Sequence, residues 1–312
     1  MAAYILRRLW QMAPTMLGVI LLVFFLFNWV GGDPAYILAG KMSNPEQIAN
    51  IRQQLGIDQP YYVQLWIFIQ QIATFNFGNS WSTGEAVSSI ISSRLGPSLT
   101  VLLPLTVIET LIAIALALLI AFRRGSITDR AVMVTCTVGM SISILVYIIV
   151  GQYVFAYQLG FFPVQGWGNS LAENLFRYSA LPVLIALAVG VAPSLRLFRS
   201  FVLDEVNQDY VRTARAKGVP ERRVKWVHVL RNASIPIITH VMSNLPALLI
   251  GAFLIERFFS IPGIGREVIL AVERSDFPVI KAITVYVAAA TMLFNLLTDL
   301  LYQAVDPRVQ LK

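Results

Sequence analysis

Six long apolar stretches constrain this chain more than any other feature of its sequence. A membrane-spanning helix needs about 20 mostly apolar residues. Runs of that kind cover residues 10–30, 98–122, 131–157, 180–198, 235–255 and 279–301. The sequence therefore predicts an all-α polytopic membrane protein with about six transmembrane helices.

The composition excludes an ordinary soluble domain. Only 13% of the residues are charged and 57% are hydrophobic, whereas soluble domains carry roughly 25% charged residues. The first apolar run follows Arg7 and Arg8, as the apolar part of a signal peptide would. It is too long for that role and no small-residue cleavage site follows it, so we expect a retained span.

The basic residues are concentrated on one side of the predicted membrane. Sixteen of the 24 lie in segments that alternating spans bring to the same side, against six acidic residues there. They are Arg7 and Arg8, then Arg123, Arg124 and Arg130, nine residues from Arg196 to Arg231, and Arg308 and Lys312. The positive-inside bias makes this side cytoplasmic and puts both termini there. The net charge of +7 thus reflects topology, and we expect no nucleic-acid binding.

The chain divides into three predicted parts: an N-terminal span (residues 1–30), an external segment (31–97) and a five-helix core (98–312). In the external segment, Asn44 and Pro45 predict the start of one helix, and Pro60 leads into a second over residues 61–75. We expect these helices to form a small external cap. The core contains a long polar and basic loop, residues 199–234, on the cytoplasmic side.

The chain shows few residues suited to a cofactor, a metal or catalysis. Its single cysteine, Cys136, lies in an apolar run and is expected to be buried. Two histidines and one cysteine, far apart in sequence, disfavour a zinc cluster. The sequence has no Gly-x-x-x-x-Gly-Lys-Ser/Thr phosphate loop, so we expect no nucleotide to be bound by this chain.

The cytoplasmic loop predicts two short helices at a sharp bend. Asp209 is a suitable N-cap residue, and Lys217 followed by Gly218 is a typical helix end. Pro220 opens a second helix that we expect to end near Arg231. Local physics leaves two interpretations open: a docking surface for a protein partner, or a solvated basic loop near anionic lipid.

The same loop resembles a known family. It begins Asp209-Tyr-Val-Arg-Thr-Ala-Arg-Ala-Lys-Gly218 and ends His228-Val-Leu-Arg-Asn-Ala233. This is similar to the coupling loop of binding-protein-dependent ABC importer permeases, in the form found in their dipeptide/oligopeptide/nickel subgroup. Of the general Glu-Ala-Ala-x-x-x-Gly signature, only Ala214 and Gly218 are kept.

Further similarities to that subgroup follow in order along the chain. They are Arg7-Arg8-Leu9, Gly32-Asp33-Pro34-Ala35, Leu55-Gly-Ile-Asp-Gln-Pro60, Phe77-Gly-Asn-Ser80, Pro262-Gly-Ile-Gly265 and Asp306-Pro307-Arg308. The external segment after the first span resembles the first of the two paralogous permeases that such systems use.

The resemblance implies a type I ABC importer permease fold and ATP-driven import of peptides across a prokaryotic inner membrane. It implies assembly with a second, paralogous permease, two ABC ATPase subunits that bind ATP and Mg²⁺, and an extracytoplasmic substrate-binding protein. This chain would be a transport subunit and not an enzyme. The residues expected to couple it to an ATPase are Asp209, Arg212, Thr213, Ala214, Arg215 and Lys217, with Gly218 shaping the bend.

Two other classes of protein were weighed against this interpretation. A secondary transporter driven by an ion gradient would often show inverted repeats, and no repeat is visible in the sequence. A membrane enzyme would need a convergent catalytic set, which the scarcity of histidine and cysteine disfavours.

A few polar residues lie inside the predicted spans. Glu109 lies near the centre of the second span, where a carboxylate costs roughly 2.5–3.5 kcal/mol. It either lines the translocation pathway or hydrogen-bonds to a neighbouring helix, and we favour the second interpretation. We expect Asp299 to be structural, and His240 and Asn244, one turn apart, to hydrogen-bond between helices.

Overall fold

The computed structural model describes residues 2–29, 34–39 and 44–305, and almost all of this part of the chain is helical. The all-α prediction is therefore confirmed. An isolated antiparallel bridge joins Asn79 and Ala86. Gly32, Asp33 and the motif at residues 306–308, which contributed to the resemblance, lie outside the described residues.

The helices follow one another with short connections. In chain order they are α1 (Ala2–Trp29), α2 (Pro34–Ala39), α3 (Pro45–Leu55), α4 (Tyr61–Ala73), α5 (Val87–Ala121), α6 (Ile127–Ser141), α7 (Ile144–Gly151), α8 (Leu171–Glu173), α9 (Ala180–Val206), α10 (Asp209–Ala216), α11 (Glu221–Arg223), α12 (Leu230–Asn244), α13 (Ala247–Ile250), α14 (Phe253–Phe258), α15 (Ile264–Glu273) and α16 (Phe277–Val305). Three π-helical segments lie among them: η1 (Gln152–Gln158), η2 (Asn174–Tyr178) and η3 (Val224–Val229).

The described helices include five that are long and apolar enough to cross a membrane, and six if one bent pair counts as a single span. This agrees with the predicted number. The five are Leu6–Trp29, Val87–Ala121, Ala180–Val206, Glu221–Phe258 and Phe277–Leu300, and the bent pair is Ile127–Ser141 with Ile144–Gln158.

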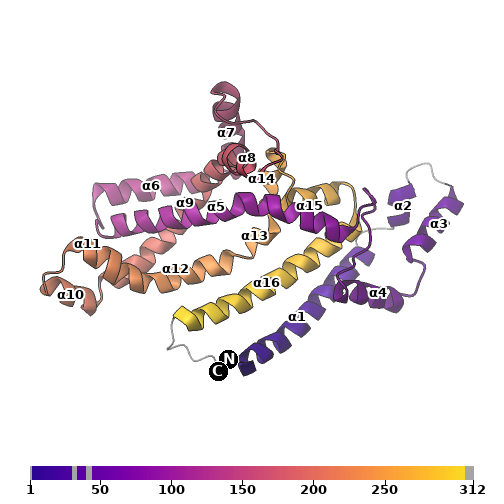
Figure 1. Cartoon of the computed structure of the whole chain (residues 1–312), viewed down its shortest axis with the longest axis horizontal. Coiled ribbons are helices and arrows are strands. Elements are labelled where there is room, and N and C mark those ends of the chain that lie inside the picture. The colour runs from indigo at the N-terminus through magenta and orange to yellow at the C-terminus, as the bar shows by residue number, and fades with distance from the viewer. Residues whose placement is uncertain (1, 30–33, 40–43, 306–312) are drawn as a thin grey trace.

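The spans α5 and α9 form the centre of the molecule. They pack along each other, and just over half of the most apolar part of α9 is buried (56%), more than in any other described span. At one end of this pair lie α10 and α11, and at the opposite end of the molecule lie α2, α3 and α4 (Figure 1). The α10 end and the opposite end are therefore separated by the length of the spans.

The third span is bent, and not the single straight helix predicted over residues 131–157. Its two halves, α6 and α7, meet at an angle of 91°. Ser143 has an extended backbone and caps α7 by accepting a hydrogen bond from the amide of Leu145. The hydroxyl of Tyr147 donates to the carbonyl oxygen of Gly139 across the bend, at 3.1 Å. Serine pairs are among the residues at which helices kink, so the bend has a local cause.

The fifth span begins earlier than residue 235 and is interrupted before residue 255. Residues 221–244 form one continuous helix, made of α11, η3 and α12. Short breaks then separate α12 from α13 and α13 from α14. At the second break Gly251 has φ +83°, and a Cβ there would lie 2.5 Å from the amide nitrogen of Gly265. Glycine is needed at this position for both its conformation and the close approach.

The external segment folds as predicted around two proline-initiated helices. Pro45 is the first residue of α3, the side chain of Gln47 accepts from the amide of Asn44, and α4 begins directly after Pro60. Phe68 of α4 packs into a cluster with Ile20, Val23 and Phe24 of α1 and Val285 of α16. The segment is thus fixed to the first and last spans. The helix α5 begins at Val87, inside the stretch assigned to this segment.

A buried carboxylate holds the chain together where the fifth span is broken. Glu256 is completely buried. It accepts hydrogen bonds from the hydroxyl of Ser98 at 2.8 Å, the amide of Ala252 at 3.0 Å and the amide of Arg266 at 3.0 Å. A Cβ at Gly263 would lie 2.3 Å from the Glu256 carboxylate. The Pro262–Gly265 motif therefore supplies the space that this carboxylate occupies, and we call these contacts the Glu256 network.

A second buried carboxylate, Asp276, lies at the start of α16. It accepts hydrogen bonds from the hydroxyls of Ser80 and Ser82 and from the amide of Trp81, the last at 3.1 Å. Asp276 and Ser80 are 2% and 3% exposed. The Gly78-Asn79-Ser80 stretch thus joins the loop before α5 to the last span.

Candidate functional site

The candidate site is the sharp turn between α9 and the helix that begins at Glu221. We call residues 207–220 the elbow. It consists of the short helix α10 and the two connections on either side of it. The elbow lies at the extreme end of the molecule (Figure 1), so its outer surface is not covered by the rest of the described chain.

The helix α10 begins one residue away from its predicted cap. Gln208 is the N-cap residue, with an extended backbone and no side-chain capping bond, and Asp209 is the first helical residue. The carbonyl oxygen of Gln208 already accepts from the amides of Val211 and Arg212, so the capping geometry belongs to Gln208. Asp209 keeps a favourable place, because a negative charge in the first turn interacts well with the helix dipole.

The end of α10 is as the sequence predicts. Lys217 is the C-cap residue, and Gly218 follows with φ +76°. The amide of Gly218 donates to the carbonyl oxygen of Arg215, and the amide of Val219 to that of Ala214. A Cβ at Gly218 would meet no atom within 4 Å. Glycine is favoured here for its backbone conformation and not for lack of space.

One face of α10 is firmly attached to the body of the protein. Val211 and Ala214 are buried in a cluster that includes Val202 of α9, Val224 of η3 and Ala233 of α12. Ala214, which the sequence placed among the residues facing a partner, therefore packs against its own chain. Its small side chain allows α10 to lie close to its neighbours.

A tyrosine reinforces this attachment. The hydroxyl of Tyr210 donates to the carboxylate of Glu205 at 2.6 Å, which ties the start of α10 to the end of α9. Burial raises the pKa of Tyr210 to about 12, and the neighbouring Glu205 adds to the shift. Tyr210 therefore keeps its proton at neutral pH and remains a donor.

The other face of α10 is exposed and polar. Asp209, Arg212, Thr213, Arg215 and Lys217 are all exposed. Two of the arginines have partners within the loop: Arg212 lies 3.5 Å from Asp209, and Arg215 lies 2.7 Å from Glu221. Exposed pairs of this kind are worth little energetically, so these side chains can exchange their partners for others.

Sequence reasoning missed a shallow groove beside the elbow. It is lined by Pro220, Arg222, Arg223, Trp226 and Val227, and Trp226 is 46% exposed. Arginine and tryptophan are enriched where proteins bind one another. The signal in the sequence is the Arg222-Arg223 pair followed by Trp226 one helical turn later.

It also missed an ion pair that fixes the base of the elbow. The guanidinium of Arg199 in α9 forms two hydrogen bonds to the carboxylate of Asp129 in α6, at 2.9 and 2.8 Å. Asp129 is 5% exposed and also accepts from the amide of Gly125 at 3.0 Å. The sequence analysis had counted both residues only as charges.

Glu109 lies between α5 and α9. The hydroxyl of Ser194 donates to its carboxylate at 2.6 Å, and a Cβ at Gly190 would lie 2.8 Å from the same carboxylate. This is the interhelical hydrogen bond that the sequence analysis favoured. A role of Glu109 in the translocation pathway stays a prediction.

The other polar residues of the spans have local partners. Asp299 pairs with Arg8 at 2.9 Å, joining α16 to α1. Asn244 and His240 contact each other at 3.1 Å along α12, and His240 meets the ring of Phe198 in α9 edge-on. The hydrogen bond predicted to join helices thus lies within one helix. Among the described residues, no three His, Cys, Asp or Glu side chains come together as metal ligands.

Comparison with known proteins covers the whole chain. Residues 113–311 match the family described as binding-protein-dependent transport system inner membrane component, and residues 1–103 match the N-terminal family of the same membrane components.

Characterised and inferred relatives agree with this match. A probable peptide ABC transporter permease of Sinorhizobium fredii is 33% identical over 99% of this chain and all of the relative. The glutathione transport system permease protein GsiC of Salmonella choleraesuis is 35% identical over the full length of both. A putative peptide permease of Brucella ovis is 36% identical over 99% of each chain. With its multispan helical fold and these full-length similarities, the chain belongs to the inner membrane permease family of binding-protein-dependent ABC importers.

Proposed function

We propose that this permease moves short peptides across the cell membrane and that the elbow is its contact with a separate ABC ATPase. The substrate class follows from the relatives, whose names include peptide and glutathione permeases. Glutathione is itself a small peptide-like molecule, so both names point to the same chemical class.

The observation that carries the ATPase contact is the two-sided construction of α10. Its inner face is fixed by Val211 and Ala214 in a buried cluster, and its outer face presents Asp209, Arg212, Thr213, Arg215 and Lys217. A contact that transmits force needs both an accessible surface and a rigid attachment. The exposed arginines and Trp226 of the neighbouring groove extend the same surface.

The proposed mechanism is a rigid-body change. Two ATPase subunits bind ATP and Mg²⁺ and close around the nucleotide, which displaces the elbow. Because residues 221–244 form one continuous helix, this displacement passes into the fifth span. The protein would then switch between two packed arrangements that nucleotide binding favours to different degrees.

The proposal includes the other partners and the orientation of the chain. A second, paralogous permease would complete the pathway, and an extracytoplasmic binding protein would deliver the peptide. The elbow, the start of α1 and the end of α16 would face the cytoplasm, as the positive-inside bias indicates.

A cysteine experiment tests the contact and the orientation together. The single native cysteine, Cys136, is buried, so Cys136→Ser gives a cysteine-free background. In that background we introduce Arg212→Cys, at a side chain that is 74% exposed. As a control we introduce Ser89→Cys, at an exposed position near the start of α5.

We expect the cysteine at position 212 to crosslink to the ATPase in inner membranes, and to react with a membrane-impermeant maleimide only after spheroplasts are lysed. The cysteine at position 89 should react in intact spheroplasts and give no ATPase crosslink. Reaction of position 212 from outside would overturn the orientation, and the absence of any ATPase crosslink would overturn the coupling role.

A further inference from the structure

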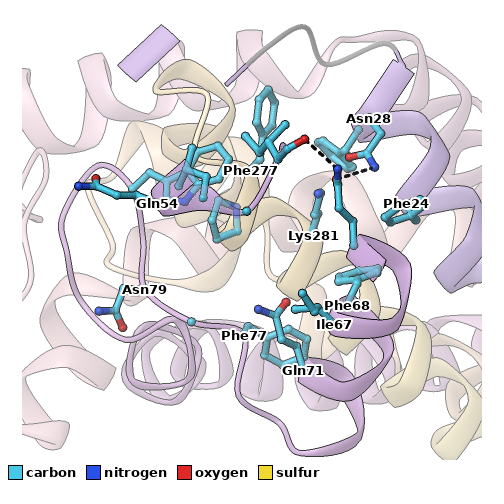
Figure 2. Close-up of a pocket in the computed structure, with 18 of the residues that line it drawn as sticks. Phe24, Asn28, Gln54, Ile67, Phe68, Gln71, Phe77, Asn79, Phe277 and Lys281 are labelled. Atoms are coloured by element: carbon cyan, nitrogen blue, oxygen red, sulfur yellow. Dashed lines mark hydrogen bonds between the residues drawn. The ribbon is translucent and has the colours of Figure 1, made fainter. Parts of the chain in front are cut away.

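A cavity of about 460 Å³ lies at the opposite end of the molecule from the elbow. It is enclosed by the end of α1, the helix α4, the loop that leads to Trp81 and the start of α16 (Figure 2). Its apolar walls are aromatic and consist of Phe24, Phe27, Phe68, Phe77, Trp81 and Phe277. A volume of this size is typical of small-molecule sites, which range over roughly 300–1,000 Å³.

One positive charge points into this aromatic cavity. The ammonium of Lys281, in the first turns of α16, lies 5.7 Å from the ring centres of both Phe27 and Phe68 (Figure 2). No acidic side chain lines the cavity, and the ion pairs of the described residues do not include Lys281. Two ring faces stabilise a cation only partly. The site therefore lacks an anion of its own.

Free amide groups surround the same space. The side chains of Gln54, Gln71 and Asn79 line the cavity and form no hydrogen bond within the described part of the chain. Asn28 is different, because its amide donates to Gln64 at 3.4 Å. Each free amide offers both a donor and an acceptor, which is the complement that a peptide group requires.

We propose that this cavity binds the carboxyl-terminal end of a short peptide, with Lys281 pairing the terminal carboxylate. The aromatic walls would take an apolar side chain and the free amides would bind the peptide backbone. This inference rests on the proposed function, since it takes the transported peptide as the ligand. It adds a binding site on the permease itself, outside the elbow and outside the central pair of spans.

The test compares a peptide acid with its amide. Ala-Ala-Phe and Ala-Ala-Phe-amide differ only in the group that Lys281 would bind. Their binding to the full chain, held in nanodiscs of zwitterionic lipid, is measured by equilibrium dialysis. We expect the acid to bind at least about tenfold more tightly, because a charge-assisted hydrogen bond is roughly twice as strong as a neutral one.

Variants assign that preference to one residue. Lys281→Met should remove it, whereas Lys281→Arg should keep most of it. Lys225→Met is the matched control, because Lys225 also lies over an aromatic ring, that of Phe122, but near the elbow; it should keep the full preference. A size-exclusion profile like that of the unsubstituted chain shows that each variant is folded.

Several outcomes would overturn the site. These are equal binding of acid and amide, no binding of either, or a preference that survives in Lys281→Met. Loss of acid binding when phosphatidylglycerol replaces the zwitterionic lipid would assign the lysine to a lipid phosphate, and would also overturn it. ATP-driven uptake of Ala-Ala-Phe by the assembled transporter separates the two proposals. If uptake occurs and the site fails, only this inference falls; if no peptide is transported, the proposed function falls.

Discussion

The two ends of the molecule use charged residues in opposite ways. At the elbow, charges are exposed or paired with each other, as in Arg215–Glu221 and Arg199–Asp129. At the other end, Glu256 and Asp276 are buried and their printed hydrogen bonds come from hydroxyls and backbone amides. The first arrangement leaves a surface that can bind a partner, and the second stabilises a fixed fold. Substitutions at the two ends should therefore affect different properties.

The largest effect is expected from Glu256→Gln. The side chain keeps its shape, but an NH₂ group then faces donors that are buried and need an acceptor. Leaving such groups unsatisfied costs about 1–3 kcal/mol each, so we expect a loss of about 3 kcal/mol in stability. Thermal unfolding of the purified protein measures it as a lower Tm. Glu273→Gln is the control, because Glu273 pairs with Arg257 at an exposed site. Equal Tm values for both variants would contradict a stabilising role for the Glu256 network.

A smaller effect, on coupling and not on stability, is expected from Gly218→Pro. Proline requires φ near −65°, whereas Gly218 has φ +76°, and it removes the amide that donates to Arg215. We expect the protein to reach the membrane while peptide-stimulated ATP hydrolysis and uptake fall by about ten- to hundredfold, that is, by roughly 1.4–2.8 kcal/mol. Gly218→Ala is the control and should lose far less, since a Cβ fits there. Normal uptake by the proline variant would argue against the coupling role of the elbow.

The smallest effect is expected for the ion pair at the base of the elbow. A double-mutant cycle with Asp129→Asn and Arg199→Met isolates the interaction between the two side chains. Both are largely buried and joined by two hydrogen bonds, so we expect a coupling free energy of about 1–2 kcal/mol. The measurement is the Tm of the four proteins. Additive effects of the two substitutions would show that the pair does not stabilise the elbow.

Much of the architecture could be predicted because its causes are local. Length and apolarity identify the spans, Pro45 and Pro60 identify the starts of α3 and α4, and Lys217 with Gly218 identifies the end of α10. In each case the responsible residue lies within a turn of the feature it produces.

The breaks in the third and fifth spans were missed because an average over apolar residues hides them. Ser143 and Gly251 are single residues within otherwise apolar runs. The second helix of the loop was predicted to end near Arg231, but nothing between Glu221 and Asn244 stops it. Pro236 lies inside this helix, where a membrane span tolerates it.

The long-range contacts could not be predicted at all. Ser98 and Glu256 are 158 residues apart, and Ser80 and Asp276 are 196 apart. No periodicity relates such distant residues, so the sequence gives their chemistry without their partners. The same holds for the cavity around Lys281, whose walls come from four separate segments.

The uninterrupted helix from residue 221 to residue 244 has a mechanical consequence. At 1.5 Å per residue it is about 36 Å long, comparable to the thickness of a membrane. It acts as a rod with one end at the elbow and the other at the breaks before Glu256. A tilt applied at the first end is delivered almost undiminished to the second, where flexible joints absorb it and the anchored chain beyond stays still.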